Sequence, residues 1–213
     1  INYAGNREAA EATLAAIAAA GGQAFAVQGK LAGEAEANAL LAALDLELER
    51  RTGSTGIDIL VNNIGGGEYG RIVDIDEAFY DQVMTNNVRA AFFLTKALHG
   101  RIRDFGRVIN LSSVGARLTD PGIISYTMAK AAVDAFTRVL AQDLGERGIT
   151  VNGVAPGFTA GETNAHVVDD PEAAKGVTGA TALARFGQPE EIADVVYMLA
   201  SPLGRWVTAQ TID

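Results

Sequence analysis

A tyrosine and a lysine stand four positions apart in the otherwise apolar segment SYTMAKAAV, residues 125–133. On a helix, Tyr126 and Lys130 would share one face, one turn from each other. A free phenol has a pKa of about 10, too high for ready proton exchange at neutral pH. A neighbouring ammonium stabilises the phenolate and lowers this pKa, so the pair predicts a general acid and base. Alone, such a pair is more often a packed ring beside a solvated charge.

A pair of serines ends an apolar run shortly before this tyrosine. Ser112 and Ser113 close the segment GRVINLSS, and Ser113 lies thirteen positions before Tyr126. The apolar run predicts a parallel strand that is buried on both faces. Hydroxyls at its carboxyl end would emerge at the sheet edge where the Tyr126 helix begins. A serine there can donate a hydrogen bond to a carbonyl oxygen, although turn chemistry is the simpler role.

Short apolar runs alternate with helical patterns along the whole chain. We expect strands at 24–27, 57–63, 106–113, 149–156 and 206–212, and helices at 6–20, 34–51, 76–98, 124–146 and 189–200. This alternation predicts an α/β fold: a doubly wound, Rossmann-like parallel sheet in a three-layer αβα arrangement. We interpret residues 1–213 as one domain. The weak periodicity of 158–186 predicts a mobile lid over the site.

Composition excludes several classes of function. The chain has 213 residues, a net charge of −9 and a sequence pI near 4.7, which disfavours binding to nucleic acid or to an anionic membrane. It has no cysteine and two histidines far apart in sequence, so we expect neither disulfides nor a metal site. No apolar run long enough to span a bilayer and no secretory signal is visible, and we therefore expect a cytoplasmic protein.

Several motifs, taken in their order and spacing, resemble the classical short-chain dehydrogenase/reductase family. They are NNIG (62–65), NNV (86–88), SSVG (112–115), YTMAK (126–130), NGVAPG (152–157) and PEEIADVVYMLAS (189–201). The resemblance extends from residue 1 to 213 and is nearest to the bacterial 3-oxoacyl-carrier-protein reductases. It implies NAD(P)-dependent hydride transfer between a nicotinamide cofactor and a small-molecule carbonyl or alcohol substrate.

The resemblance also implies roles for individual residues. Tyr126 would be the acid and base, and Ser113 would orient the substrate oxygen. Lys130 would lower the pKa of the tyrosine and hydrogen-bond the nicotinamide ribose. Asn87 would hold a water molecule that links the lysine to solvent, with Asn86 as the alternative in the doubled asparagine. A simpler role for Asn87 is a hydrogen bond to its own helix backbone.

Further residues would hold the cofactor by the same resemblance. Asn63 and Gly65 would lie near its adenosine side. Pro156 and Gly157 would turn the chain at the nicotinamide, and Thr159 stands close to the position of a threonine that usually holds the carboxamide.

The chain departs from the family pattern at several positions. The glycine-rich turn T-G-x-x-x-G-x-G is absent, and that turn usually cradles the pyrophosphate. We therefore expect the first strand, this turn and the first helix to lie upstream of Ile1, and the C-terminus to be incomplete. Lys30 replaces a usual aspartate beside adenine, while Ile64 and Ala209 replace smaller residues.

The first residues, which we expect to correspond to the end of the family's second strand, bear on the choice of cofactor. Members that prefer NAD usually carry an acid there, which binds the ribose diol. The segment INYAGNREA has none at this place and instead offers Asn2 and Arg7. An arginine near a 2′-phosphate suits NADP, so we expect NADP(H) to be favoured over NAD(H).

The sequence leaves two alternative functions open and also predicts a homo-oligomer. The missing glycine turn and Lys30 are also compatible with a non-catalytic member of the fold, a nucleotide-sensing or structural subunit. A cofactor-independent enzyme would usually need an arginine in place of Lys130. The apolar face of 131–144 predicts a homodimer or homotetramer, unless Val133, Phe136 and Leu140 pack on the sheet.

Overall fold

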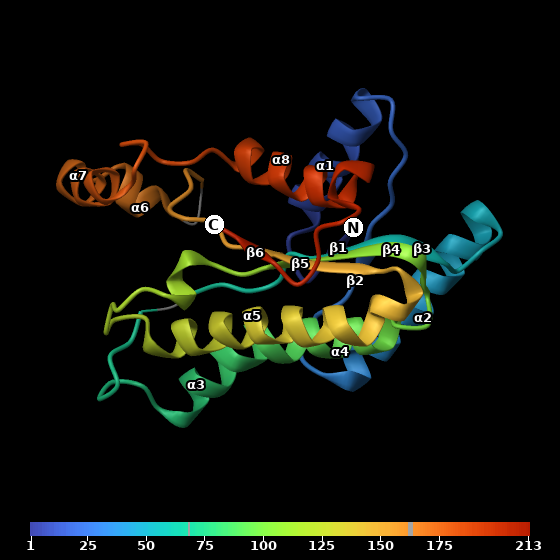
Figure 1. The fold of residues 1–213 in the computed structure, drawn as a ribbon, viewed down its shortest axis with the longest axis horizontal. Coiled ribbons are helices and arrows are strands. Elements are labelled where there is room, and N and C mark those ends of the chain that lie inside the picture. The colour runs from blue at the N-terminus through green and yellow to red at the C-terminus, as the bar shows by residue number, and fades with distance from the viewer. Residues whose placement is uncertain (68, 162–163) are drawn as a thin grey trace.

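The computed structural model describes residues 1–67, 69–161 and 164–213. Its strands all pair in parallel: β1 (Asn2–Tyr3), β2 (Val27–Gln28), β3 (Ile57–Asn62), β4 (Ile102–Leu111), β5 (Thr150–Val154) and β6 (Thr211–Ile212). The main helices are α1 (Arg7–Ala19), α2 (Glu34–Thr52), α3 (Glu77–Met84), α4 (Ala90–Leu98), α5 (Ile124–Leu144) and α8 (Pro189–Ala200). Figure 1 shows α1 and α8 on one side of the strands, and α3, α4 and α5 on the other. This is the predicted three-layer α/β fold.

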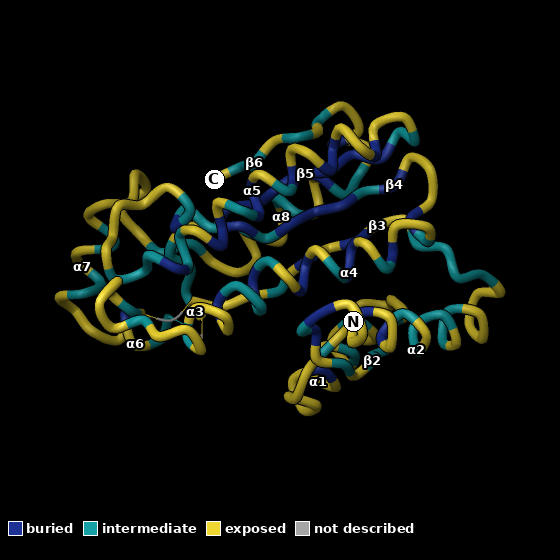
Figure 2. Tube along the Cα trace, turned by 90° about the horizontal axis from the view of Figure 1, so that it is seen from below, coloured by how far each residue is buried: buried dark blue, intermediate teal, exposed yellow. Residues whose placement is uncertain are grey.

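The strands fall into two sheets. β1 pairs with β2, and the other strands form a sheet of order β3-β4-β5-β6. Figure 2 shows β1 and β2 on the side of β3 that faces away from β4. Among the described residues no strand joins β1 to β3, and Ile59 and Val61 of β3 are 47% and 40% exposed. The N-terminal sheet is therefore not held to the larger one by strand pairing.

Helix contacts connect the two sheets instead. Leu40 of α2 and Leu94 of α4 belong to one buried cluster. At its rim, Lys96 Nζ lies 2.6 Å from a carboxylate oxygen of Glu34. Arg101, which follows α4, makes a second ion pair with Asp45 of α2, at 2.7 Å. Packing between α2 and the α4 region thus positions the N-terminal unit.

The central strand β4 is buried on both faces, as its apolar run predicts. Val108 belongs to the cluster under α4 and α5. Its neighbour Ile109 packs on the opposite face with Val154 and with Leu199 of α8. Successive side chains of a strand point to opposite faces, so both helical layers are anchored on this strand. Its carboxyl end therefore has a fixed position.

Helix ends follow local signals in the sequence. The carboxylate of Asp76 accepts a hydrogen bond from Phe79 N at 2.8 Å and caps α3, as short polar side chains do at helix starts. α8 begins with Pro189 after a capping box formed by Gln188 and Glu191, as its sequence predicts. α2 ends at Gly53, whose φ of 68° lies in the left-handed region.

Several element boundaries differ from the sequence predictions. β2 is limited to two residues because β1 offers only two partners. β4 begins earlier than predicted, at Ile102, because a bulge follows its pairing with Ile57. β6 begins only at Thr211, after Ala209, whose φ of 60° interrupts an extended run.

Two predicted elements have a different internal structure. The helix predicted over 76–98 is divided into α3, a π-helical turn at Thr85–Arg89 and α4. The segment predicted as a lid, 158–186, contains α6 (Ala165–Val168) and α7 (Pro171–Ala180), while its residues 162–163 lie outside the described ranges. In the part of the chain that is described, no helix is long and apolar enough to cross a membrane.

Candidate active site

The ring of Tyr126 lies in a slot between two glycines. Tyr126 is in the first turn of α5, while Gly67 follows β3 and Gly115 follows β4. A Cβ atom at Gly67 would lie 3.3 Å from the ring, and one at Gly115 only 3.1 Å from it. A side chain at either position would therefore press on the ring. The two loops hold the phenol by close backbone contact.

Ser113 meets this phenol, as its spacing predicts. Its hydroxyl is hydrogen-bonded to Tyr126, and it also accepts a hydrogen bond from Gly115 N at 3.0 Å. The neighbouring Ser112 is buried, and its hydroxyl donates to the carbonyl oxygen of Lys130 at 3.4 Å. Ser113 is thus the serine that faces the phenol, whereas Ser112 ties the end of β4 to α5.

Lys130 is almost completely buried beside the same ring. Its side chain is 4% exposed, and Nζ donates to the carbonyl oxygen of Leu111 at 2.8 Å. Nζ lies 5.7 Å from the centre of the Tyr126 ring. Burial lowers the pKa of Lys130 to about 8, and the carboxylate of Asp134 acts in the opposite direction. The lysine is therefore still mainly charged at neutral pH.

Burial also decides the pKa of the phenol. Desolvation raises the pKa of Tyr126 above its ordinary value, and the hydrogen bond with Ser113 only partly offsets this. The pKa of this phenol is therefore raised, whereas the sequence predicts a lowered one, and the effect of Lys130 on it stays a prediction. An apolar surrounding disfavours the phenolate, and this effect is larger than the opposite effect of Ser113. The phenol consequently keeps its proton and is in the form that can donate it.

Asn87 connects the π-helical turn to the loop after β3. Its amide nitrogen donates to Val83 O at 2.9 Å and to Gly66 O at 3.0 Å. Its side-chain oxygen accepts from Gly66 N at 3.3 Å. The simpler role considered for this residue, a bond to its own helix backbone, is thus present together with a bond across to the loop. π-helical turns are frequent at functional sites.

Position 65 must be glycine, because the side chains of Asn87 and Lys130 approach its backbone closely. It has a φ of 136°, and a Cβ atom there would lie 2.3 Å from Asn87 Oδ1 and 3.0 Å from Lys130 Nζ. No side chain fits in that space. The neighbouring Asn86, the alternative to Asn87, lines the smaller of the two cavities described next.

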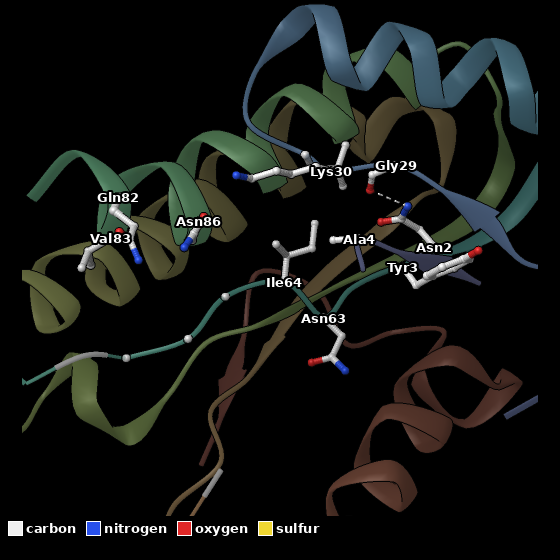
Figure 3. A pocket seen from close by; sticks show the side chains of 14 residues that line it. Asn2, Tyr3, Ala4, Gly29, Lys30, Asn63, Ile64, Gln82, Val83 and Asn86 are labelled. Carbon is white, nitrogen blue, oxygen red and sulfur yellow. Dashed lines mark hydrogen bonds between the residues drawn. The ribbon is translucent and has the colours of Figure 1, made fainter. Parts of the chain in front are cut away.

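Two cavities meet at the loop 63–67. The smaller, of about 410 Å³, is lined by residues that include Asn2, Tyr3, Lys30 and Asn86. Figure 3 shows Lys30 extending along this cavity from beyond the end of β2. The larger cavity, of about 840 Å³, is lined by six further predicted residues, namely Ser113, Tyr126, Lys130, Pro156, Gly157 and Thr159. Asn63 and Gly65 belong to the walls of both.

Of the predicted cofactor residues, Asn2 is engaged with the backbone of β2, and Arg7 lies outside both cavities. The side-chain amide of Asn2 donates to Val27 O at 3.1 Å and to Gly29 O at 2.9 Å, so it joins β1 to β2. Arg7 is the first residue of α1 and is not part of the wall of either cavity. Lys30, in contrast, places a cation on the wall of the smaller cavity.

The sequence analysis missed a buried polar network directly behind the site. The amide of Asn62 donates to Thr95 Oγ1 at 3.0 Å and to Asn110 Oδ1 at 2.8 Å. Asn110 in turn donates to Thr137 Oγ1 at 2.9 Å. The network joins β3 and β4 to α4 and α5. An asparagine inside each of two apolar strand segments was the signal that could have revealed it.

These cavities fit an elongated nucleotide. They adjoin along a loop of three successive glycines, and a Cβ atom at Gly66 or Gly157 would meet no atom within 4 Å. The backbone at both positions is therefore open to a ligand. Within the ranges described, no group of three or more carboxylates or histidines could hold a metal ion.

Comparison with known proteins assigns the chain to a family. A family described as Enoyl-(Acyl carrier protein) reductase matches residues 1–213. A Staphylococcus aureus protein named 3-oxoacyl-[acyl-carrier-protein] reductase FabG is 37% identical over 214 residues, covering 100% of this chain and 84% of that protein. The chain belongs to the classical short-chain dehydrogenase/reductase family and is an NAD(P)-dependent oxidoreductase of that family.

Other relatives have similar names or similar structures. A Synechocystis 3-oxoacyl-[acyl-carrier-protein] reductase is 35% identical over 216 residues, with 100% of this chain and 83% of the relative covered. The crystal structure of the angucycline C-6 ketoreductase LanV with bound NADP has a TM-score of 0.94 at 34% identity, covering 100% of this chain and 82% of LanV. The reductase LugOII, described as promiscuous, has a TM-score of 0.93 at 36% identity, with 100% and 84% covered.

Proposed function

We propose that this chain is an NADP(H)-dependent ketoreductase in which Tyr126 is the catalytic acid. The observation that carries the proposal is the contact of the half-buried Tyr126 with Ser113, beside the buried ammonium of Lys130. Reduction of a ketone adds a hydride to its carbon and a proton to its oxygen. A bound nicotinamide cofactor supplies the hydride. The chain's own residues position the oxygen and deliver the proton.

Each side chain has one part in this proton transfer. The hydroxyl of Ser113 donates to the substrate oxygen and fixes its place. The hydroxyl of Tyr126 gives its proton to that oxygen as negative charge develops there. The ammonium of Lys130, held by the carbonyl oxygen of Leu111, stabilises the phenolate that remains. Asn87 keeps the loop 63–67 against this group through its two bonds to Gly66.

The first experiment tests Tyr126 itself. Replacing Tyr126 with Phe removes the proton but keeps the ring that fills the slot. We expect turnover to fall by about two to four orders of magnitude, while NADPH binding measured by fluorescence stays within a few-fold. Tyr80→Phe, on α3 and away from both cavities, is the matched control. Near-normal turnover of the Tyr126 variant would refute the assignment.

The preference for NADP(H) is supported by the absence of an acid at Asn2 and Tyr3 and by the NADP named with LanV. Lys30 adds positive charge to the smaller cavity. Titration with NADPH and NADH decides the question, because tighter binding of NADH would contradict the proposal. Lys30→Ala and Arg7→Ala, compared in the same titration, show which cation contributes.

The proposed substrate is an apolar ketone. Tyr69, Leu118, Ile123, Phe158 and Ile192 line the larger cavity, and the relatives are named for reduction of 3-oxoacyl groups and of angucycline ketones. A panel of aromatic ketones, 3-oxoacyl thioesters and short polar ketones, scored by loss of NADPH absorbance, tests this class. A preference for the polar ketones would count against it.

We further propose a cytoplasmic homodimer or homotetramer formed through α4 and α5. Val133 and Leu140 are buried against the sheet, but Phe92 and Val139 remain 46% and 71% exposed. An apolar helix face of this kind suits a two-fold interface. Sedimentation of the protein and of Val139→Glu tests it, with dissociation of the variant expected and a monomeric parent protein contradicting the proposal.

A further inference from the structure

A buried carboxylate lies one helical turn behind Lys130. Asp134 follows Lys130 by four residues on α5 and is 8% exposed. A charged group is costly to bury unless it has a partner. No role in the proton transfer described above falls to this residue. Its position on the lysine's own helix face makes the lysine its natural electrostatic partner.

The orientation of this carboxylate is set by the C-terminal strand. The hydroxyl of Thr211 on β6 donates to Asp134 Oδ1 at 3.3 Å. Thr211 pairs with Gly153 of β5, and a Cβ atom at Gly153 would lie only 2.7 Å from Thr211 Oγ1. The glycine therefore leaves room for the threonine hydroxyl. β5 and β6 together hold the carboxylate on the face of α5 that also carries Lys130.

The other groups around Lys130 are neutral within the described ranges. On α5 itself, the titratable neighbours of Lys130 are Tyr126 and Asp134. The π-helical turn contributes the amide of Asn87. The end of β4 contributes the carbonyl oxygen of Leu111 and the hydroxyl of Ser112. A carbonyl oxygen solvates an ammonium but does not balance its charge. Asp134 is thus the group whose charge opposes the effect of burial on the lysine.

We propose that Asp134 is a positioning residue that keeps Lys130 charged within the site, with Thr211 orienting its carboxylate. The inference rests on the proposed function, because it matters for turnover only if the charge of Lys130 supports Tyr126. The alternative is a purely structural role, in which Asp134 only attaches β6 to α5. Burial lowers the pKa of Lys130 and Asp134 raises it, and the two roles therefore differ in what they do to the lysine.

The direct test reads the charge of Lys130 without any cofactor. The sequence has four lysines, Lys30, Lys96, Lys130 and Lys175, so the Cε resonances of ¹³C-labelled lysine can be assigned by single substitutions and followed with pH. In Asp134→Asn we expect the midpoint of Lys130 to fall by about one pH unit. The alkaline limb of kcat should move to lower pH by the same amount.

Control variants separate charge from structure. Asp143→Asn removes a carboxylate from the exposed side of the same helix and should leave the Lys130 midpoint unchanged. Thr211→Val removes the hydroxyl but keeps the carboxylate, and it should shift the midpoint less than Asp134→Asn does. Should Asp134→Asn fail to fold, Asp134→Ser removes the same charge with a smaller side chain.

The outcomes distinguish this inference from the proposed function. An unchanged Lys130 midpoint in the folded Asp134 variant would overturn the role of Asp134, even if Tyr126→Phe is inactive as expected. A shifted midpoint with an active Tyr126→Phe would confirm the electrostatic contact but refute its use in turnover. A shift in both the Lys130 midpoint and the kcat profile supports the whole proposal.

Discussion

Half-buried Tyr126 and buried Lys130 lie together at the carboxyl edge of the sheet, and desolvation disfavours the charged form of each. The phenol therefore holds its proton more firmly than in water, while the ammonium holds its proton less firmly. Between neutral pH and about 8, both groups are mainly protonated. This combination suits reduction, which consumes a proton.

The charge of Lys130 has a cost in stability that depends on pH. Its pKa is about 8 in the folded chain and 10.5 as a free side chain. Between these values the unfolded chain holds a proton that the folded chain has released, so stability rises with pH in this window. Below pH 8 both states are protonated and the full cost remains, on the order of 3 kcal/mol.

Lys130→Met tests this cost. The variant lacks the titrating group, so the free energy of unfolding of wild type relative to the variant should rise as the pH goes from 8 to 10 and stay flat from 6 to 8. At pH 7 the variant should be at least as stable as wild type, because it lacks the cost of the buried ammonium, yet inactive. Urea unfolding at several pH values measures this, and Lys175→Met on α7 is the control. A difference that falls with increasing pH would contradict the lowered pKa.

Gly65→Ala should damage the site at its centre. The new methyl group would lie 2.3 Å from Asn87 Oδ1 and 3.0 Å from Lys130 Nζ, and φ at this position is unfavourable for alanine. We expect a loss of about 1–3 kcal/mol in the free energy of unfolding together with a large loss of turnover. Gly66→Ala, where the added Cβ atom meets open space, should keep its stability but weaken NADPH binding. Equal stability of Gly65→Ala and wild type would refute the close approach.

For single residues, the sequence predicted which side chains meet in the site better than it predicted their pKa shifts. The spacing of Ser113, Tyr126 and Lys130 indicated their meeting, because helix periodicity and strand ends fix where side chains point. The direction of the pKa shift of Tyr126 could not be predicted, because it depends on how deeply the ring is buried. Arg7 was predicted from its distance in sequence to a strand end, but α1 carries it away from the cavity walls.

Among the elements, the division of 76–98 into α3, a π-helical turn and α4 bears most on the site. The extra residue of a π-helical turn shifts the side chains that follow it relative to those before it. Asn87 in this turn thereby bonds both Val83 and the loop at Gly66. Apolar periodicity predicts a continuous helix here, because one inserted residue changes the pattern too little to be recognised.

The polar network between strands and helices gives a prediction at the element scale. Asn110→Ala leaves the amide of Asn62 and the hydroxyl of Thr137 each without one partner in a buried place. We expect a loss of about 2–4 kcal/mol in the free energy of unfolding, measured by urea unfolding. Asn63→Ala, the exposed neighbour in the same NNIG motif, should cost less than about 0.5 kcal/mol. Similar losses in both variants would contradict the role of the network.

In the whole molecule, attachment of the N-terminal unit depends on helices. β1 and β2 do not pair with β3 in the described part of the chain, so contacts of α2 with α4 position residues 1–52. The alternation of strands and helices predicted the α/β class and its layers. The sequence also predicted that the first strand of the family's sheet is not among residues 1–213, and in the described residues no strand pairs with both β1 and β3.

Leu40→Ala tests this attachment. Leu40 is 6% exposed in the shared cluster, and its truncation should cost about 2–5 kcal/mol. Hydrogen exchange should accelerate in β2 and α2 before it does so in β4 and β5. Leu46→Ala on the same helix, where the side chain is 74% exposed, is the control. Uniform acceleration across both sheets would show that the two units open together.

The slot formed by Gly67 and Gly115 limits what laboratory evolution can do with this enzyme. A flat ring of fixed outline fits between the two backbones, so phenylalanine can enter but the wider indole of tryptophan cannot. The scaffold thus accepts a ring of the same outline that lacks the acid more readily than any side chain wider than the phenol. A designer who wants a wider side chain there would have to move both loops at once.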